Sequence, residues 1–241
     1  MNLAVKRVVV FGAVIGMAMA GWGELPSLAV ADDSLWHRQS VDFLGTTLDK
    51  NHQPIGVVAT LDIEFRIREE QQAMNVSFSS LPGKFSPLTQ IAIQEGIKSS
   101  AVAAGLNPRT WDIFLTVPYY GVRIFGESLS AMVSLAVLAM ANHHPILAHR
   151  VVTGKITRDG RIGAVGGIPL KIYAAHSAHI QRVIVPEDRY QEDSDWQTPF
   201  LMQVSPARDL RQAYQMLTGR RLEISKGEVI DGKRAIGSPF E

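Results

Sequence analysis

A short serine-containing segment directly precedes an apolar stretch of the chain. It reads Gly126-Glu127-Ser128-Leu129-Ser130, and a buried helix rich in Ala, Met, Leu and Val is predicted over 130–142. Free backbone N–H groups at the start of a helix can stabilise an oxyanion, so a serine placed there has the setting of a nucleophile. Position alone favours a simpler role, that of helix N-cap, for both Ser128 and Ser130.

A lysine and a threonine further along the chain are the other candidates for chemistry. Lys171 follows the pair Gly166-Gly167 and stands between Leu170 and Ile172. A lysine amine is a base only when neutral, and its pKa in water is about 10.4, so a role as base requires burial. By position alone Lys171 is a surface lysine and Thr153 is an ordinary strand residue.

Five histidines suggest a metal-binding or scaffold protein as an alternative. His176 and His179 are three residues apart on a predicted helix, which is a ligand spacing, and the others are His143, His144 and His149. The chain has no cysteine and no carboxylate cluster near these histidines. It also has no His-Glu-x-x-His segment and no Gly-Lys-Ser/Thr phosphate loop. We therefore expect no metal and no other cofactor.

Alternation and turn residues predict the elements of the first half. Two alternating stretches are expected to be paired strands, and a proline opens the helix that follows. On that helix we expect Leu88, Ile91 and Ile97 to face inward. The predicted elements are strands over 57–67 and 74–79, a helix over 87–104 and a strand over 111–117.

Helices and strands interleave through the second half. Asp159-Gly160 suits a tight hairpin turn, Ser205-Pro206 supplies an N-cap and a first-turn proline, and Gly219 ends the last helix. Together the two halves predict a single α/β or α+β domain of mixed sheets with interleaved helices. Besides 130–142, the predicted elements are strands over 151–157, 161–165, 180–185 and 200–204 and helices over 169–178 and 205–217.

The N-terminus has the order of a secretory signal. Lys6 and Arg7 precede an uncharged run over 8–20, and Ala29-Val30-Ala31 forms a cleavage site. The run has 13 residues, whereas a spanning helix needs about 20, so we expect cleavage after Ala31 and no membrane span afterwards. An uncleaved N-terminal anchor is the alternative. The predicted organisation is a signal peptide over 1–31, an extension over 32–54, a domain over 55–220 and a tail over 221–241.

The charge balance excludes one class of partner. The chain has 24 basic and 23 acidic side chains, and residues 1–31 carry two basic and one acidic, which leaves 22 of each sign. A neutral chain without a basic cluster offers no electrostatic basis for binding nucleic acid.

The segments described above resemble the proteolytic domain of Lon peptidases, especially that of archaeal, membrane-anchored Lon proteins. The nucleophile box of that family is of Gly-Asp-Ser-Ala-Ser type and corresponds to 126–130 here. A Thr-Gly-x-Ile-Thr strand follows at 153–157, then a Gly-Gly pair at 166–167 and a lysine four residues later. The separations agree too, with 25 residues from Ser128 to Thr153 and 43 from Ser128 to Lys171. The resemblance extends over about residues 57–217.

This resemblance implies a serine endopeptidase with Ser128 as nucleophile and Lys171 as general base. It also implies that Thr153 orients the lysine amine and that Gly126 and Glu127 support the site. Substrates would be unfolded or flexible polypeptides, hydrolysed without ATP because the chain has no phosphate loop. The family often forms rings of six, so a homo-oligomer is expected, and the signal peptide implies a periplasmic location.

Four residues depart from the family pattern. Phe114 and Thr116 occupy strand positions where the family often has histidines, Lys155 replaces an acidic residue after Thr-Gly, and Leu129 replaces a small residue. Since Ser128 and Lys171 are both retained, these departures concern substrate preference and the charge around Lys171. A catalytically inactive Lon-like binding module of the cell envelope is the alternative function.

Overall fold

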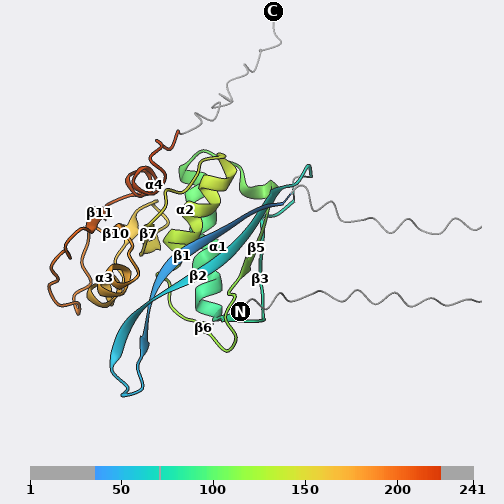
Figure 1. Cartoon of the computed structure of the whole chain (residues 1–241). Coiled ribbons are helices and arrows are strands. Elements are labelled where there is room, and N and C mark those ends of the chain that lie inside the picture. Colours follow the sequence, from blue (N-terminus) through green and yellow to red (C-terminus); the bar gives the residue numbers. More distant parts are fainter. Residues whose placement is uncertain (1–35, 71, 224–241) are drawn as a thin grey trace, which may run out of the picture. The chain divides into compact units, whose positions relative to one another are not determined.

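The computed structural model describes residues 36–70 and 72–223, and within them helices and strands interleave as predicted (Figure 1). The predicted mixed sheets with interleaved helices are confirmed. The elements are β1 (His37–Leu48), β2 (Pro54–Ile67), β3 (Asn75–Phe78), β4 (Lys84–Phe85), α1 (Pro87–Ala103), the 3-10 turn η2 (Pro108–Thr110), β5 (Trp111–Thr116), β6 (Arg123–Ile124), α2 (Ser130–Ala141), β7 (Arg150–Val152), β8 (Lys155–Ile156), β9 (Ile162–Gly163), α3 (Ile168–Ser177), β10 (Arg182–Pro186), β11 (Gln203–Ala207) and α4 (Leu210–Thr218).

The larger sheet has the strand order β1-β2-β5-β3. Leu61, Ile63 and Phe65 of β2 alternate with polar residues and are fully buried, as a half-buried strand requires. The predicted pairing of β2 with the strand at 74–79 is wrong, because β5 lies between β2 and β3. β5 pairs antiparallel with β2 and parallel with β3.

The first strand of this sheet comes from a segment that the sequence does not reveal as a strand. The extension expected over 32–54 instead contains β1, which pairs antiparallel with β2 from His37↔Phe65 to Leu48↔Pro54. Val41, Phe43 and Leu44 of β1 are buried in the core. The apolar alternation in β1 is too short to predict a strand by itself, and pairing with the longer β2 completes it.

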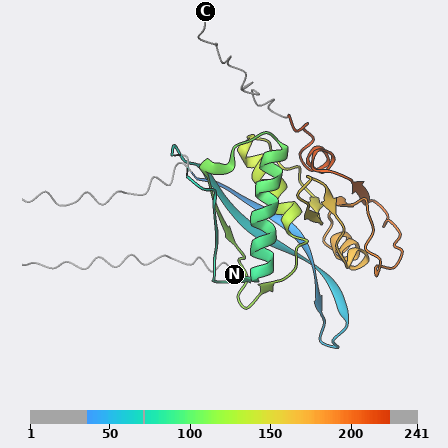
Figure 2. The same cartoon turned by 180° about the vertical axis from the view of Figure 1, so that it is seen from behind.

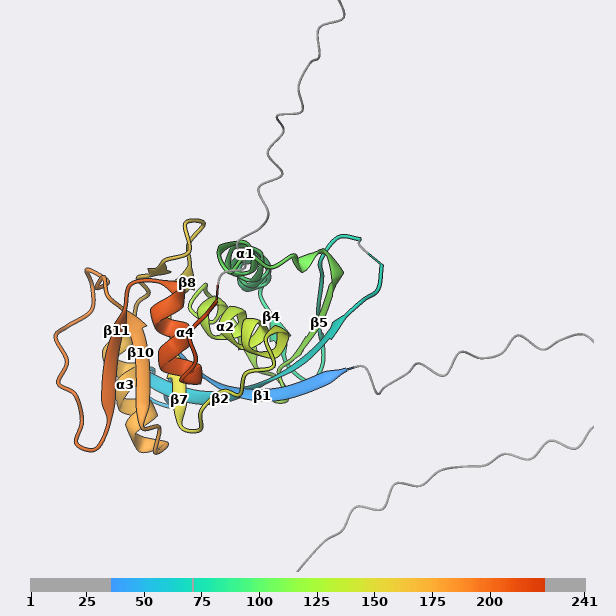
Figure 3. The same cartoon turned by 90° about the horizontal axis from the view of Figure 1, so that it is seen from above.

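Two helices cover one face of the larger sheet (Figures 2 and 3). α2 is buried from Ser130 to Met140, as expected for a helix that is apolar all round. α1 packs beside it through residues such as Ile93 and Ile97. The expectation that Leu88 and Ile91 face inward is wrong, since these residues are 56% and 53% exposed.

A second, parallel sheet has the strand order β11-β10-β7, and α3 and α4 pack against it (Figure 3). The strand predicted over 180–185 corresponds to β10. The helix predicted over 205–217 begins later, because Ser205 and Pro206 belong to β11, which pairs with β10. Asp209 is the N-cap of α4, and its side chain accepts a hydrogen bond from the Gln212 N–H at 3.0 Å.

The predicted hairpin around Asp159-Gly160 is shorter than expected. Only β8 and β9 pair antiparallel across this turn, while β7 belongs to the parallel sheet. Gly154 separates β7 from β8 and has a φ of +154°. A side chain there is excluded by space as well, since a Cβ on Gly154 would lie 2.7 Å from Ile162 Cγ2.

The predicted signal peptide over 1–31 and most of the predicted tail over 221–241 lie outside the described residues. Among the residues that the structure does describe, no helix has the length and apolar character needed to cross a membrane.

Close contact between β2 and α3 generates a stability prediction. A Cβ on Gly56 would lie 2.0 Å from the Leu170 carbonyl oxygen, so Gly56→Ala must push α3 away from the strand. We expect a loss of about 2 kcal/mol or more in the free energy of unfolding, measured by urea denaturation. Gly45→Ala on the paired strand is the control, because its Cβ would meet Val57 Cγ2 at an ordinary 3.4 Å. Equal stability of the two variants would contradict this packing.

Candidate active site

Ser128 lies in the turn before α2. The N-cap position of α2 is occupied by Leu129, and no side chain caps the helix. Ser130 is engaged elsewhere: its Oγ donates to the Glu127 carbonyl at 2.8 Å and accepts from the Ile156 N–H at 3.3 Å. Within the described residues the Ser128 hydroxyl has no hydrogen-bond partner. The N-cap role that position alone favoured is therefore not the role of either serine.

Lys171 lies in the first turn of α3 and is buried, with only 3% of its surface exposed. Burial lowers the pKa of its amine to about 8, and the negative charge of Asp193 opposes part of this shift. The amine donates a hydrogen bond to Thr153 Oγ1 at 3.3 Å. The position-based expectation of a surface lysine is thus wrong, and Thr153 contacts the amine.

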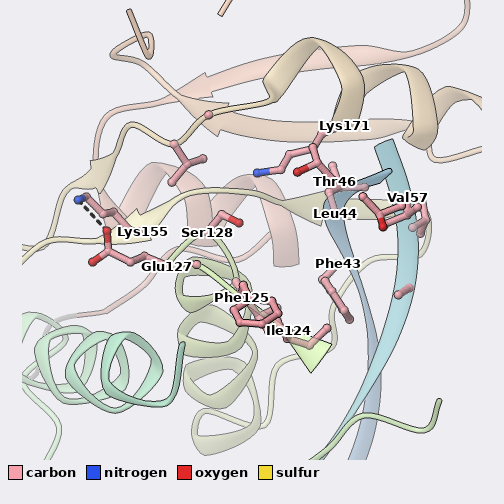
Figure 4. A pocket seen from close by; sticks show the side chains of 18 of the residues that line it. Phe43, Leu44, Thr46, Val57, Ile124, Phe125, Glu127, Ser128, Lys155 and Lys171 are labelled. Carbon is pink, nitrogen blue, oxygen red and sulfur yellow. Dashed lines mark hydrogen bonds and ion pairs between the residues drawn. The ribbon is translucent and has the colours of Figure 1, made fainter. Parts of the chain in front are cut away.

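The serine and the lysine line one cavity of about 890 Å³. Figure 4 shows the Ser128 hydroxyl and the Lys171 amine directed toward the space between them. In the described part of the chain no hydrogen bond joins the two groups directly. Catalytic hydrogen bonds are often long before substrate binds, so this arrangement is compatible with proton transfer from the hydroxyl to the amine.

The segment Thr153-Gly154 ties the two groups together through the backbone. The Gly154 N–H donates to the Ser128 carbonyl at 3.1 Å, and the Gly154 carbonyl accepts from the Ala131 N–H at 3.2 Å. The Thr153 N–H donates to the Ile184 carbonyl at 2.9 Å. Two adjacent residues therefore contact both the serine turn and the lysine amine, and they fix the position of each relative to the second sheet.

Two backbone donors at and beside Ser128 are available to a ligand. Within the described residues the N–H groups of Ser128 and Leu129 have no acceptor, whereas the next N–H, of Ser130, donates to the Glu127 carbonyl at 3.0 Å. Free N–H groups at the start of a buried helix are suited to hold a developing negative charge.

One wall of the cavity is apolar and comes largely from the ribbon of β1 and β2. It contains Phe43 and Leu44 of β1 and Val57 of β2, and Ile124 and Phe125 face them from the segment before the serine (Figure 4). The residues of β1 were missed in the sequence because that segment was assigned to an extension. Only the pairing of β1 with β2 brings them to the site.

Gly126 and Glu127 shape the turn before Ser128. Gly126 has a φ of +85°, and its carbonyl accepts a hydrogen bond from Thr89 Oγ1 at 2.9 Å. The Glu127 carboxylate forms an ion pair with Lys155 at 3.2 Å (Figure 4). The charge of Lys155, a departure from the family pattern, is thus balanced by a neighbour at the rim of the cavity.

Phe114 and Thr116, which also depart from the family pattern, lie on β5 away from the site. On β5 they alternate with Ile113 and Leu115, which are buried beneath the helices, so they face the opposite side of the sheet. Neither residue lines the cavity. Any effect of these two residues on Ser128 and Lys171 is therefore indirect.

Of the histidines in the predicted metal alternative, His143, His149 and His179 lie in turns, whereas His176 lies in α3. His143 and His179 follow α2 and α3 with φ of 53° and 58°, and the next N–H in each case bonds back into the helix, from His144 to Ala139 at 2.8 Å and from Ile180 to Ala175 at 2.9 Å. This is the geometry of a helix C-terminal cap. Among the described residues, no group of three His, Cys, Asp or Glu side chains is placed to hold a metal ion.

Comparison with known proteins gives one consistent family. The model of the Lon protease (S16) C-terminal proteolytic domain matches residues 69–200. A Lon protease of Clostridioides difficile is 36% identical over 114 residues, which cover 45% of this chain and 14% of that protein. Lon protease 1 of Syntrophobacter fumaroxidans is 27% identical over 121 residues, covering 48% of this chain and 15% of that protein. The peroxisomal Lon protease homolog 2 of Kluyveromyces lactis is 36% identical over 88 residues, covering 34% and 9%.

The buried amine generates a prediction about stability and pH. Because the pKa of Lys171 falls from 10.5 to about 8 on folding, the unfolded chain binds more protons between these values, and stability rises with pH in that window. Below pH 8 burial of the ammonium lowers the free energy of unfolding by about 3 kcal/mol, and the hydrogen bond to Thr153 offsets about 1 kcal/mol of this loss. We therefore expect Lys171→Met to raise the free energy of unfolding at pH 7 by about 2 kcal/mol, measured by urea denaturation.

The advantage of Lys171→Met should shrink as the pH rises from 8 and be lost above 10.5, where the wild-type amine is neutral in both states. Lys98→Met on the exposed side of α1 is the matched control and should change little at any pH. A Lys171→Met variant that is less stable than the wild type at pH 7 would show that the amine is not desolvated.

Proposed function

This chain belongs to the family of Lon protease (S16) C-terminal proteolytic domains, and we propose that it hydrolyses peptide bonds with a dyad of Ser128 and Lys171. The observation that carries the proposal is the buried amine of Lys171, which lines the same cavity as Ser128, whose hydroxyl has no hydrogen-bond partner among the described residues. The chain spans only about a seventh of the bacterial Lon proteases that it matches, so the activity of those whole proteins is not assumed for it.

Burial supplies the neutral amine that the reaction needs. With a pKa of about 8, roughly a tenth of the Lys171 side chains are neutral at pH 7. At the ordinary value of 10.5 the fraction would be about one in three thousand. The fold therefore raises the population of the active base about 300-fold, a gain of about 3 kcal/mol.

The reaction follows from the positions of these groups. Ser128 Oγ attacks the carbonyl carbon of the peptide bond while its proton passes to the neutral Lys171 Nζ. The oxyanion accepts hydrogen bonds from the N–H groups of Ser128 and Leu129. The ammonium of Lys171 then protonates the leaving amine, which leaves an acyl-serine.

Water completes the cycle. Lys171, again neutral, takes a proton from water as it attacks the acyl carbonyl, and the proton returns to Ser128 when the acid product leaves. Throughout these steps Thr153 Oγ1 accepts a hydrogen bond from the amine and keeps it directed to the cavity.

The lining of the cavity supports a class of substrate. Its wall of Phe43, Leu44, Val57, Ile124 and Phe125 suits an apolar side chain of a polypeptide. The 241 residues contain no phosphate-loop motif, so we propose hydrolysis without ATP. Such an enzyme acts on chains that are already unfolded or on flexible segments.

Substitution of Ser128 or Lys171 tests the proposed peptidase activity. We expect Ser128→Ala and Lys171→Met each to lower the rate of hydrolysis of unfolded casein, without ATP, by about 10⁴-fold or more. In fluorogenic peptides, an apolar residue before the cleaved bond should give faster cleavage than an acidic or basic one. Ser177→Ala, at an exposed position at the end of α3, is the control and should keep full activity.

Equal rates of casein hydrolysis by the wild type and Ser128→Ala would contradict the proposed peptidase activity and favour the inactive, Lon-like binding module instead. Loss of activity in the presence of a strong chelator would point to a metal-dependent reaction that the dyad does not require.

We also propose export to the periplasm, supported by the basic, apolar and A-x-A order of residues 1–31. N-terminal sequencing of the protein from a periplasmic fraction is expected to begin at Asp32. A membrane-bound protein that retains Met1 would indicate the uncleaved anchor, and an intact cytosolic protein would contradict export. The homo-oligomeric ring and the lack of nucleic acid binding stay predictions.

A further inference from the structure

A carboxylate from a distant loop caps the helix that carries Lys171. The N-cap position of α3 is Gly167, which has no side chain to accept the free N–H groups there. Asp193 supplies the acceptors instead, taking the Gly167 N–H on Oδ1 at 2.7 Å and the Ile168 N–H on Oδ2 at 3.0 Å. A carboxylate at this end of a helix is also favoured by the helix dipole.

The loop that carries Asp193 is held against the glycine pair at a second point. A Cβ on Gly166 would lie 3.3 Å from the ring of Tyr190, so this ring packs directly on the Gly166 backbone. The Asp193 N–H in turn donates to the Tyr190 carbonyl at 3.1 Å. The segment 190–193 therefore covers Gly166 and Gly167, and Tyr190 lines the cavity beside it.

Through this contact the loop reaches the proposed base. The Lys171 N–H bonds to the Gly167 carbonyl at 3.0 Å, which closes the first turn of α3. We propose that Asp193 is a positioning residue for Lys171, because its carboxylate anchors the turn from which the amine extends to Thr153 and the cavity. The inference rests on the proposed function in so far as Lys171 is the base.

Asp193 also acts on the amine through its charge. Its carboxylate favours the protonated lysine and so opposes the effect of burial. The other ionisable side chains that line the cavity are Tyr119, Arg123, Glu127, Lys155 and Tyr190. Glu127 and Lys155 are paired with each other, and the parts of β1 and β2 at the cavity contain no ionisable side chain. Asp193 is thus both an anchor for the helix and the opposing charge for the base.

The test measures the pKa of Lys171 directly, by NMR titration of protein labelled with ¹³C at lysine Cε, with Lys171→Met to assign the signal. In Asp193→Asn we expect the pKa of Lys171 to fall by about half a unit, a roughly threefold weaker hold on the proton, because the opposing charge is lost. The acid limb of kcat/KM should move to lower pH by the same amount. The plateau of kcat should fall about tenfold, since the NH₂ of Asn cannot accept a hydrogen bond and replaces one of the two carboxylate oxygens that receive the N–H groups.

Two variants make the result specific. Asp193→Glu retains the charge and should keep the pKa of Lys171 near the wild-type value. Asp195→Asn alters a carboxylate of the same loop that is 92% exposed and paired with Arg189, and it should change neither the pKa nor kcat. If Asp193→Asn does not fold, Asp193→Ser, whose hydroxyl still accepts one N–H, serves the same comparison.

An unchanged pKa of Lys171 in the variants without charge would overturn the inference, even if they lose activity, because that loss would then be structural. A wild type that hydrolyses nothing, but whose Lys171 pKa still falls in Asp193→Asn, would contradict the proposed function and leave the inference standing. The two failures are therefore distinguishable.

Discussion

Desolvation of one amine is the constraint on which this site depends. Lys171 is removed from water at the start of α3, and burial lowers its pKa to about 8. An exposed lysine would be protonated at neutral pH and could not take a proton from serine. The rest of the fold offsets the free-energy cost of burying the ammonium, because its continuous core includes residues of the four-stranded and three-stranded sheets and of all four helices in the described residues.

Within residues 36–70 and 72–223, no carboxylate contacts this amine directly. Thr153 Oγ1 accepts one hydrogen bond from it, and the adjacent Gly154 bonds to the turn that contains Ser128. Asp193 meets the helix backbone rather than the amine itself. A carboxylate in contact with the ammonium would hold the proton and raise the pKa, so placing the acidic group at the helix end fits the proposed role of Lys171 as a base.

The departures from the family pattern divide by their location. Phe114 and Thr116 lie on the face of β5 away from the helices and do not line the cavity. Lys155 lies at the cavity but is paired with Glu127, which stands in the nucleophile box. The pair spans the two segments that flank the serine, so the charge of Lys155 is compensated locally and does not reach Lys171 unopposed.

Local signals in the sequence determined the helices, most strand positions and the candidate pair Ser128 and Lys171. Periodicity, prolines and glycines act between near neighbours, and the motif spacing marks the pair through the family resemblance. Only the tertiary structure decided that β1 forms a wall of the cavity, that Leu129 rather than a serine occupies the N-cap, and that Asp193 caps α3. Each of these depends on segments far apart in the chain, and burial of the amine, which the proposed role of Lys171 as base requires, exists only after those segments pack together.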